Sequence, residues 1–354
     1  MLSVYSLEKT EQWDSVVRTF VEYDVYWLSG YVKAFQIHGD GDPLLFLFEG
    51  YGVRAMNVVM KRDISKMEPF SGKIESNAYF DFSTPYGYGG WLIEGETYEQ
   101  LFTEYEEWCL KNGVISEFVR FHPVLKNHLY VESAYVVVFL GETVVVNLNS
   151  PEAIWSNITS KNRNVIRKAQ KNGIKIYNGN YPDIYDKFKV IYNDTMDKDN
   201  AEEYYYFEEE FYMSILDDLP QNAQVFYATL DSKVIAASII IAANGKQTYH
   251  LSGSLKEYAN LAPTNLLLYK AALWGGANGC KTFHLGGGVG SREDNLFKFK
   301  RAFCRGVLNK FFIGKKIINQ EVYNKLICLR SDIPANNGYF PEYRLAGDKV
   351  SHNK

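Results

Sequence analysis

A strand, a helix and a second strand are expected between residues 247 and 287. This stretch contains QTYHLSGS (247–254), APTNLLLYKAALWGGANG (262–279) and KTFHLGG (281–287). The outer segments contain Thr and aromatic residues, which suit strands, whereas the middle segment is rich in Leu and Ala, which suit helices. The helix should end at Asn278-Gly279, because these residues accept the left-handed conformation that follows many helices. Alternating strands and helices indicate an α/β fold.

The same order of elements occurs in the first half of the chain. PLLFLFEG and VRAMNVVMKR form a β-rich pair around a turn at 49–52, and a helix expected from about 97 to 111 ends at Asn112-Gly113 before the strand ISEFVRF. In the second half, QVFYATL and VIAASIIIAA form the matching pair. Both helix ends carry the motif W-x-x-x-N-G, which begins at Trp108 and at Trp274. The shared order predicts a duplication, although two helices can also end alike by chance.

The repeated plan predicts two domains. At 354 residues, the chain has the length of two domains of roughly 150–200 residues. We expect an α/β (α+β) fold with two tandem domains, each a mixed twisted sheet flanked by helices, at residues 1–149 and 150–354. The second domain should open with a helical region, because Ser150 is a preferred N-cap residue and Pro151 fits the first helical position. This region is expected to end at Asn172-Gly173.

Composition excludes several classes of protein. Hydrophobic residues make up 46% of the chain and charged residues 23%, as in ordinary folded proteins and unlike disordered chains. The net charge of -4 excludes a uniformly basic nucleic-acid-binding protein. The longest apolar run, at 234–243, has about half the length that spans a bilayer, and the first residues lack the pattern of a signal peptide. With four cysteines and no CxxC pair, the sequence favours a soluble protein of the reducing cytoplasm, without an integral membrane segment or a metal site.

Basic residues gather in two segments that contain no acidic residue, at 160–182 and at 295–320. Such runs usually form a solvated face, but two of them in one domain also fit a site for a polyanion, such as phosphates or an RNA acceptor stem. Their members are Lys161, Arg163, Arg167, Lys168, Lys171 and Lys175 in the first segment, and Lys298, Lys300, Arg301, Arg305, Lys310, Lys315 and Lys316 in the second.

Several common catalytic motifs are absent from the sequence. There is no GxxxxGK[ST] phosphate loop, no HExxH metal motif and no GxSxG nucleophile elbow, and the six histidines are scattered. The glycines at 286–288 and 290 follow an expected strand but lack the GxGxxG spacing. They could contact a phosphate, or simply let backbone segments approach closely.

The ordered series of segments in the second half resembles one protein family. SKNRNVIRKAQKNGI (160–174) is followed by YHLSGS, APTNLLLYKAALWGGANG, FHLGGG and LFKFKRAFC (296–304). In this order they resemble the FemABX peptidoglycan-bridge aminoacyltransferases and their FemAB-like or BioF2-like acyltransferase relatives. The resemblance is strongest over about 150–315 and weaker over RFHP (120–123) and the rest of the first domain. It implies two tandem GNAT-like domains.

Family members transfer an amino acid from aminoacyl-tRNA to an amine of a nucleotide- or lipid-linked muropeptide. The resemblance therefore implies this donor and this class of cell-wall precursor as acceptor, no bound cofactor, and the tRNA acceptor stem as a further partner. The family's catalytic lysine matches Lys300 in the K-F-K stretch, with Lys298 as the second candidate. Without the resemblance, these two lysines would be interpreted as outward-facing residues of an edge strand whose phenylalanines face inward.

The resemblance also implies substrate-binding residues. The family's phosphate-binding lysine matches Lys33 in YWLSGYVKAF, and its substrate-contacting tyrosines match Tyr86 and Tyr249. A second phosphate-binding residue is Arg in the family but corresponds to Lys198 here, and Lys cannot offer the bidentate fork of a guanidinium. Arg301, next to the catalytic candidates, completes the set. The coiled-coil arm of some members is absent, which weakens the expectation that the chain binds a whole tRNA body.

Three functions stay open at this point: an aminoacyl-tRNA-dependent transferase, a transferase that uses acetyl-CoA or another acyl-CoA to modify an amine of a surface polysaccharide, and a non-catalytic ligand-binding relative. Aminolysis of either donor passes through an oxyanion, which a fixed lysine in a dry cleft stabilises. No general base is evident, and the open alternatives are Asp81, Glu117 and an ester-derived hydroxyl. CoA-dependent GNAT enzymes use a glycine-rich pyrophosphate loop, whereas SLKEYANLAPTN (254–265) contains no glycine, and STPYGYGG (83–90) has glycines but no Gln or Arg in register.

Overall fold

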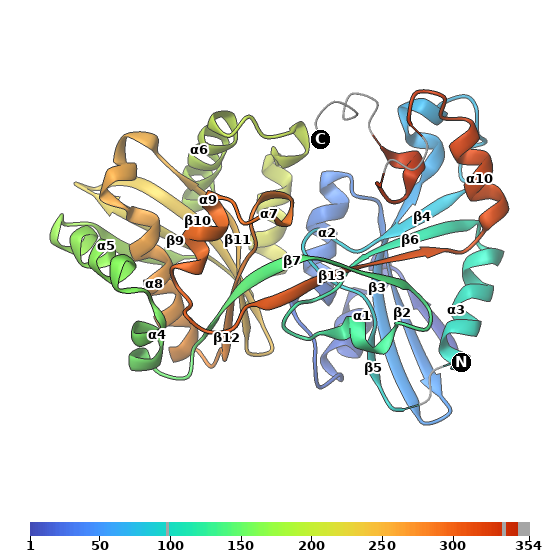
Figure 1. The fold of residues 1–354 in the computed structure, drawn as a ribbon, viewed down its shortest axis with the longest axis horizontal. Coiled ribbons are helices and arrows are strands. Elements are labelled where there is room, and N and C mark those ends of the chain that lie inside the picture. The colour runs from blue at the N-terminus through green and yellow to red at the C-terminus, as the bar shows by residue number, and fades with distance from the viewer. Residues whose placement is uncertain (97–98, 335–337, 346–354) are drawn as a thin grey trace. The chain divides into compact units, whose positions relative to one another are not determined.

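Figure 1 shows the fold in a computed structural model, which describes residues 1–96, 99–334 and 338–345. The chain forms two compact units. The first unit comprises residues 1–22, 26–140 and the chain from 312 onward, and the second unit comprises 23–25 and 141–311. The expected domain boundary at 149/150 derives from the repeated sequence plan rather than from contacts, and it stays a prediction.

The first unit contains a mixed sheet in the order β1-β2-β3-β4-β6-β13, with β5 paired to β3. Among its described strands, β4 and β6 are the parallel pair and the others are antiparallel. The elements are β1 (Leu2–Tyr5), α1 (Thr10–Arg18), α2 (Ser29–His38), β2 (Asp42–Gly50), β3 (Val53–Asp63), β4 (Phe80–Ser83), β5 (Leu92–Glu94), α3 (Glu99–Lys111), β6 (Val114–Arg120), β13 (Asn309–Ile317) and α10 (Gln320–Cys328). The hairpin β2–β3 confirms the turn expected at 49–52.

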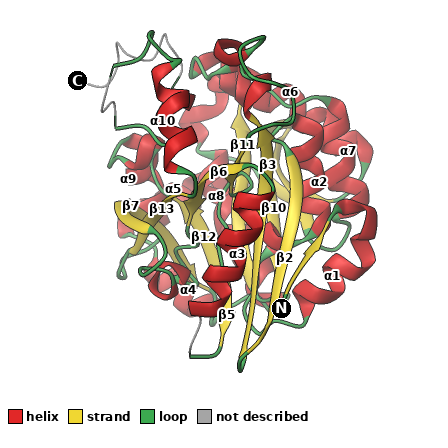
Figure 2. Ribbon diagram, turned by 90° about the vertical axis from the view of Figure 1, so that its right-hand side faces the viewer, coloured by secondary structure: helices red, strands yellow, loops and turns green. Residues whose placement is uncertain are grey.

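The second unit contains a sheet in the order β7-β12-β11-β10-β9-β8. In its described strands, β11 and β12 are the parallel pair. The elements are β7 (Val136–Asn147), α4 (Pro151–Asn157), α5 (Ser160–Lys171), β8 (Lys175–Gly179), α6 (Pro182–Lys198), α7 (Glu209–Asp218), β9 (Ala223–Leu230), β10 (Lys233–Ala243), β11 (Lys246–Ser254), α8 (Pro263–Ala277), β12 (Thr282–Gly286) and α9 (Asn295–Arg301). Each unit is thus a mixed sheet flanked by helices, which confirms the expected fold class (Figure 2).

Glycine lets two helices approach β11 closely in the second unit. A side chain at Gly275 in α8 would collide with Gln247 of β11, and a side chain at Gly253 of β11 would collide with the backbone of Ile191 in α6. The apolar core on the α8 side includes Leu267 and Phe283, both fully buried. Strand β11 therefore packs closely against both α6 and α8, and this packing fixes the positions of its side chains.

The W-x-x-x-N-G motif has the same local structure in both units. The side-chain amide of Asn112 donates to the carbonyl of Trp108 at 2.7 Å, and that of Asn278 donates to the carbonyl of Trp274 at 2.8 Å. The glycine that follows is left-handed in both, with φ of 70° and 82°. In each unit the helix also directly precedes the second strand of the parallel pair: α3 lies between β5 and β6, and α8 lies between β11 and β12.

Two local expectations were wrong. The helical region after Ser150 is two helices, because the chain is extended at Ile158 and Thr159 and a new helix starts with Thr159 as its cap. The N-cap expected at Ser150 is confirmed, since its hydroxyl accepts a hydrogen bond from the amide of Ala153. The K-F-K lysines lie in helix α9 rather than on an edge strand, because Asp294 caps a helical turn there.

Substitutions of Gly113 and Gly279 test the structure of these two helix ends. Gly279→Ala should lower the free energy of unfolding by about 1–2 kcal/mol, which is the cost of a left-handed L-residue, because no atom lies near the added methyl group. Gly113→Ala should cost more, because its methyl group would also lie 2.5 Å from the carbonyl oxygen of Ala78. Urea denaturation measures both values. Equal losses would contradict this description of the first helix end.

Candidate functional site

The parallel strands β11 and β12 are paired only over their first residues. Their pairing runs from Lys246 with Thr282 to Thr248 with His284, and β11 then continues to Ser254 without β12. Ligands of α/β proteins commonly bind beyond the carboxyl ends of parallel strands. The end of this pairing therefore marks a candidate site.

A β-bulge at His250 re-aims the side chains of β11 at this point. Leu251 pairs with Ile239 of β10 and Tyr249 pairs with Ile240, so His250 is the extra residue. Bulges of this kind occur beside active sites, where they change the face on which a side chain projects. Tyr249 consequently packs against the core that α8 covers.

Lys300 of α9 lies where β11 and β12 separate. Its ammonium donates a 2.6 Å hydrogen bond to the carbonyl of Gly287, just after β12, and lies 5.9 Å from the centroid of the Tyr249 ring on β11. The side chain is buried, and burial lowers the pKa of Lys300 to about 8, although the negative charge of Asp294 opposes the shift. The group is still mostly protonated at pH 7, so the site holds a buried cation.

Three glycines and one aspartate shape the surroundings of Lys300. A side chain at Gly286 would lie 3.3 Å from the Lys300 amine, and one at Gly288 would collide with Arg292 and Asp294. The Asp294 carboxylate accepts hydrogen bonds from the amides of Phe297 at 2.8 Å and Val289 at 3.0 Å, and so joins the glycine loop to α9. The glycine string thus makes room for the lysine and its cap. Sequence reasoning missed Asp294, although an acidic residue before a short apolar run is an N-cap signal.

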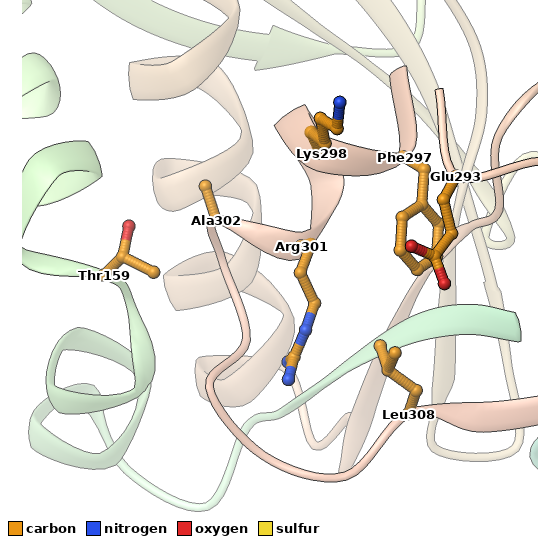
Figure 3. A pocket seen from close by; sticks show the side chains of 7 residues that line it. All are labelled: Thr159, Glu293, Phe297, Lys298, Arg301, Ala302 and Leu308. Carbon is orange, nitrogen blue, oxygen red and sulfur yellow. The ribbon is translucent and has the colours of Figure 1, made fainter. Parts of the chain in front are cut away.

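Lys298 and Arg301 lie on another side of α9. They are three residues apart, so they share one helix face, and both line a cavity of about 370 Å³ in the second unit. Figure 3 shows Arg301 extending between Thr159 and Leu308, while the Lys298 amine points away from it. The Arg301 guanidinium donates to the carbonyl of Cys304. The structure therefore separates Lys298 from Lys300, which alone contacts Gly287 and Tyr249.

Lys198 lies at the far end of β11. Its ammonium donates to the carbonyl of Ser254 at 2.7 Å and forms an ion pair with Asp194 at 3.4 Å. A phosphate at this position would compete with both partners. Lys198 is the last residue of α6, and this hydrogen bond places it beside the end of β11, the strand that carries Tyr249.

The other two substrate-binding candidates lie in the first unit. Tyr86 stacks on Phe35 of α2 with ring centroids 5.3 Å apart, and its carbonyl accepts a 2.7 Å hydrogen bond from Tyr31. The same helix carries Lys33, which is half-buried. Lys33 and Tyr86 therefore belong to neighbouring elements of the first unit.

Asp81 and Glu117 are both engaged in the core of the first unit. Burial acts to raise the pKa of Asp81, but Arg344 and Arg62 outweigh it and hold the pKa below its usual value. Burial raises the pKa of Glu117, which accepts hydrogen bonds from Tyr135 at 2.7 Å and from Asn57 and Tyr105 at 3.0 Å each. These contacts give both carboxylates a structural role.

Three amides of the loop between β11 and α8 donate to backbone carbonyls. The amides of Leu255, Tyr258 and Ala262 donate to the carbonyls of Ile235, Leu255 and Ala259. The helix then begins at Pro263, which has no amide hydrogen. The proline removes one of the amides that a pyrophosphate cradle at this helix N-terminus would use. Within residues 1–96, 99–334 and 338–345, no cluster of His, Cys, Asp and Glu could hold a metal ion, and no helix is long and apolar enough to cross a bilayer.

Asp294→Asn tests the surroundings of Lys300. Asn is as good an N-cap as Asp, so the melting temperature should change little, while the loss of negative charge should move the Lys300 titration to a pH below about 8. The midpoint is measured from the ¹³Cε resonance of Lys300, assigned with Lys300→Met. Glu293→Gln is the matched control. An unchanged midpoint in Asp294→Asn would contradict the assignment.

Comparisons with known proteins agree with this geometry. Residues 160–301 match the family model described as "Acetyltransferase (GNAT) domain". The solved structure of FemX is similar with a TM-score of 0.65 at 12% identity, covering 91% of this chain and 99% of FemX. A conserved protein of unknown function from Bacteroides thetaiotaomicron gives 0.59 at 10% identity, covering 89% and 100%. L-PGS from Bacillus licheniformis gives 0.53 at 14% identity, covering 90% and 96%.

No curated protein matches the chain in sequence. At these low identities, the structural likeness establishes the fold, which confirms the resemblance inferred from the order of the sequence segments. The family-model match covers α5 to α9 and includes Lys300. The chain is therefore an acyltransferase with a fold like that of FemX, and its residues 160–301 match the model of a GNAT acetyltransferase domain.

Proposed function

We propose that the protein transfers an aminoacyl group from aminoacyl-tRNA to an amine of a peptidoglycan precursor, a nucleotide- or lipid-linked muropeptide. The main support is the buried Lys300 cation at the separating ends of β11 and β12, in a chain with the fold of FemX. The loop that would cradle a CoA pyrophosphate contains no glycine, starts its helix with proline, and donates three of its amides to backbone carbonyls, which favours an RNA donor.

The chemistry follows from the position of Lys300. The acceptor amine attacks the ester carbonyl of the donor, and the tetrahedral oxyanion forms beside the Lys300 ammonium. Collapse breaks the ester bond, forms the amide and expels the ribose oxygen, which takes the proton lost by the attacking amine and becomes a hydroxyl. One fixed hydrogen-bond donor of this kind contributes about 3 kcal/mol to the transition state. Because the ammonium must be charged, turnover should fall as the pH rises above about 8.

The remaining candidates then have binding roles. Tyr249 and Gly287 hold the ammonium in place, and Arg301 and Lys198 supply positive charge for the substrates in the second unit. Lys33 and Tyr86 would contact the precursor in the first unit. The reaction would take place in the cytoplasm, where charged tRNA is found.

An acyl-CoA-dependent N-acyltransferase is the second candidate, because the matched family model describes acetyltransferases. A thermal-shift experiment distinguishes the two functions by comparing the melting temperature with a UDP-linked muropeptide and with acetyl-CoA. We expect a UDP-linked muropeptide to raise the melting temperature and acetyl-CoA to leave it unchanged. Stabilisation by acetyl-CoA alone would favour the second candidate.

Lys300→Met tests the catalytic role. Loss of the ammonium should reduce turnover by at least about 100-fold, in line with the loss of one oxyanion donor. The melting temperature should change little, because removing a buried charge offsets the unpaired Gly287 carbonyl. Lys298→Met is the control and should retain most turnover. Unfolding of Lys300→Met, or equal turnover of both variants, would contradict the role given to Lys300.

A further inference from the structure

The two basic segments meet at one serine. The Ser160 hydroxyl, at the first residue of α5, accepts a 3.2 Å hydrogen bond from the guanidinium of Arg163 and a 3.0 Å hydrogen bond from that of Arg305. Arg163 belongs to the first basic segment and Arg305 to the second. Residues far apart in the sequence therefore bring two guanidinium groups to the same point.

Backbone contacts hold both arginines in position. The second nitrogen of the Arg163 guanidinium faces the carbonyls of Trp155 and Ser156 at 3.4 and 3.5 Å. The amide of Arg305 donates to both the backbone and the side-chain oxygen of Asn157, at 3.0 Å each. The segment between α4 and α5 thus anchors the pair, which lowers the entropy lost when a ligand binds.

The charge of this pair is not balanced by a carboxylate. In the described part of the chain, no acidic group lies within ion-pair distance of Arg163 or Arg305, and their shared acceptor is a neutral hydroxyl. Ser160 and Arg305 are exposed, so a ligand can reach them. Guanidinium groups prefer anions that offer two or more oxygens, and phosphate is such an anion.

A cavity adjoins the arginine pair. Thr159, the residue before Ser160, lines the cavity of about 370 Å³ together with Arg301 and Lys298 (Figure 3). Glu293 also lines this cavity, so its charged side chains are two cations and one carboxylate. A molecule whose phosphate lies at Ser160 can extend into this cavity. Phe297, Ala302 and Leu308 give the same cavity an apolar surface.

We propose that Arg163 and Arg305, whose guanidinium groups meet at Ser160, form a phosphate-binding site for the acyl donor. This inference rests on the proposed function for the identity of the donor, but its chemistry is shared by two sources. A charged tRNA would place a backbone phosphodiester in the site, whereas an acyl-CoA would place one of its phosphates there. No residue of the site contacts Lys300 in the described structure, so the site can be altered without changing the catalytic cation.

Ser160→Asp is the sharpest variant. The new carboxylate would occupy both guanidinium groups as an internal anion, so it should exclude phosphate while preserving the fold. Asn172→Asp, at the other end of α5, adds the same charge without touching the site and is the control. Ser160→Ala keeps both arginines and should bind normally. Arg305→Gln should also bind weakly, and its salt dependence of RNA affinity should be shallower by about one unit of slope.

Binding is measured with two probes: an uncharged RNA acceptor-stem minihelix by fluorescence anisotropy, and acetyl-CoA by calorimetry. We expect Ser160→Asp to bind the minihelix at least about tenfold more weakly than Asn172→Asp does. The same loss for acetyl-CoA instead would support the site with CoA as its source. Equal binding by the two variants, or no binding of either probe by the unaltered protein, would overturn the site. If the site is upheld but no amino acid is ever transferred, the proposed function fails and the phosphate site stands.

Discussion

A lysine ammonium buried between two separating parallel strands is the constraint on which the site depends. A charged amine is costly to bury, and this cost is reflected in the lowered pKa of Lys300. Several features offset the cost: the Gly287 carbonyl accepts a hydrogen bond, the Tyr249 ring faces the cation, and Asp294 supplies a negative charge. Each of these groups comes from a different part of the β11–α8–β12–α9 segment, so the segment must fold correctly to hold the cation.

The two units share a plan but differ at the equivalent position. In the first unit, the parallel strands β4 and β6 stay paired as far as Ser83 with Phe118, and a further bridge joins Gly89 to Phe121. In the second unit, β11 and β12 part after Thr248. The first unit instead buries the carboxylates of Asp81 and Glu117 among hydrogen-bond donors. The buried cation therefore belongs to the second unit, where the family model also matches.

Features that depend on residues close together in the sequence could be predicted from the sequence. The turn at 49–52, the Ser150 cap and the two Asn-Gly helix ends depend on neighbouring residues, and all are present. The break of the helical region at Ile158 and Thr159 depends partly on a distant residue, because the amide of Thr159 donates to the carbonyl of Ala302 at 2.9 Å.

The candidate site was predictable only in part. The family resemblance selected Lys300, but the alternation Phe-Lys-Phe-Lys looked the same for a strand and a helix, and only the Asp294 cap distinguishes them. The glycines at 286–288 were noticed in the sequence, but their role was not, because it is to contact and make room for the Lys300 side chain, thirteen residues after Gly287. The convergence of Arg163 and Arg305 on Ser160 required the tertiary fold.

The most direct measurement is a transfer assay with a defined donor and acceptor. The purified protein is mixed with tRNA charged with radiolabelled amino acids and a UDP-linked muropeptide, and the muropeptide is analysed for label. We expect one amino acid to appear on an amine of the muropeptide, with a rate that falls above about pH 8. Transfer of an acetyl group from acetyl-CoA to an amine, with no label from any charged tRNA, would contradict the account.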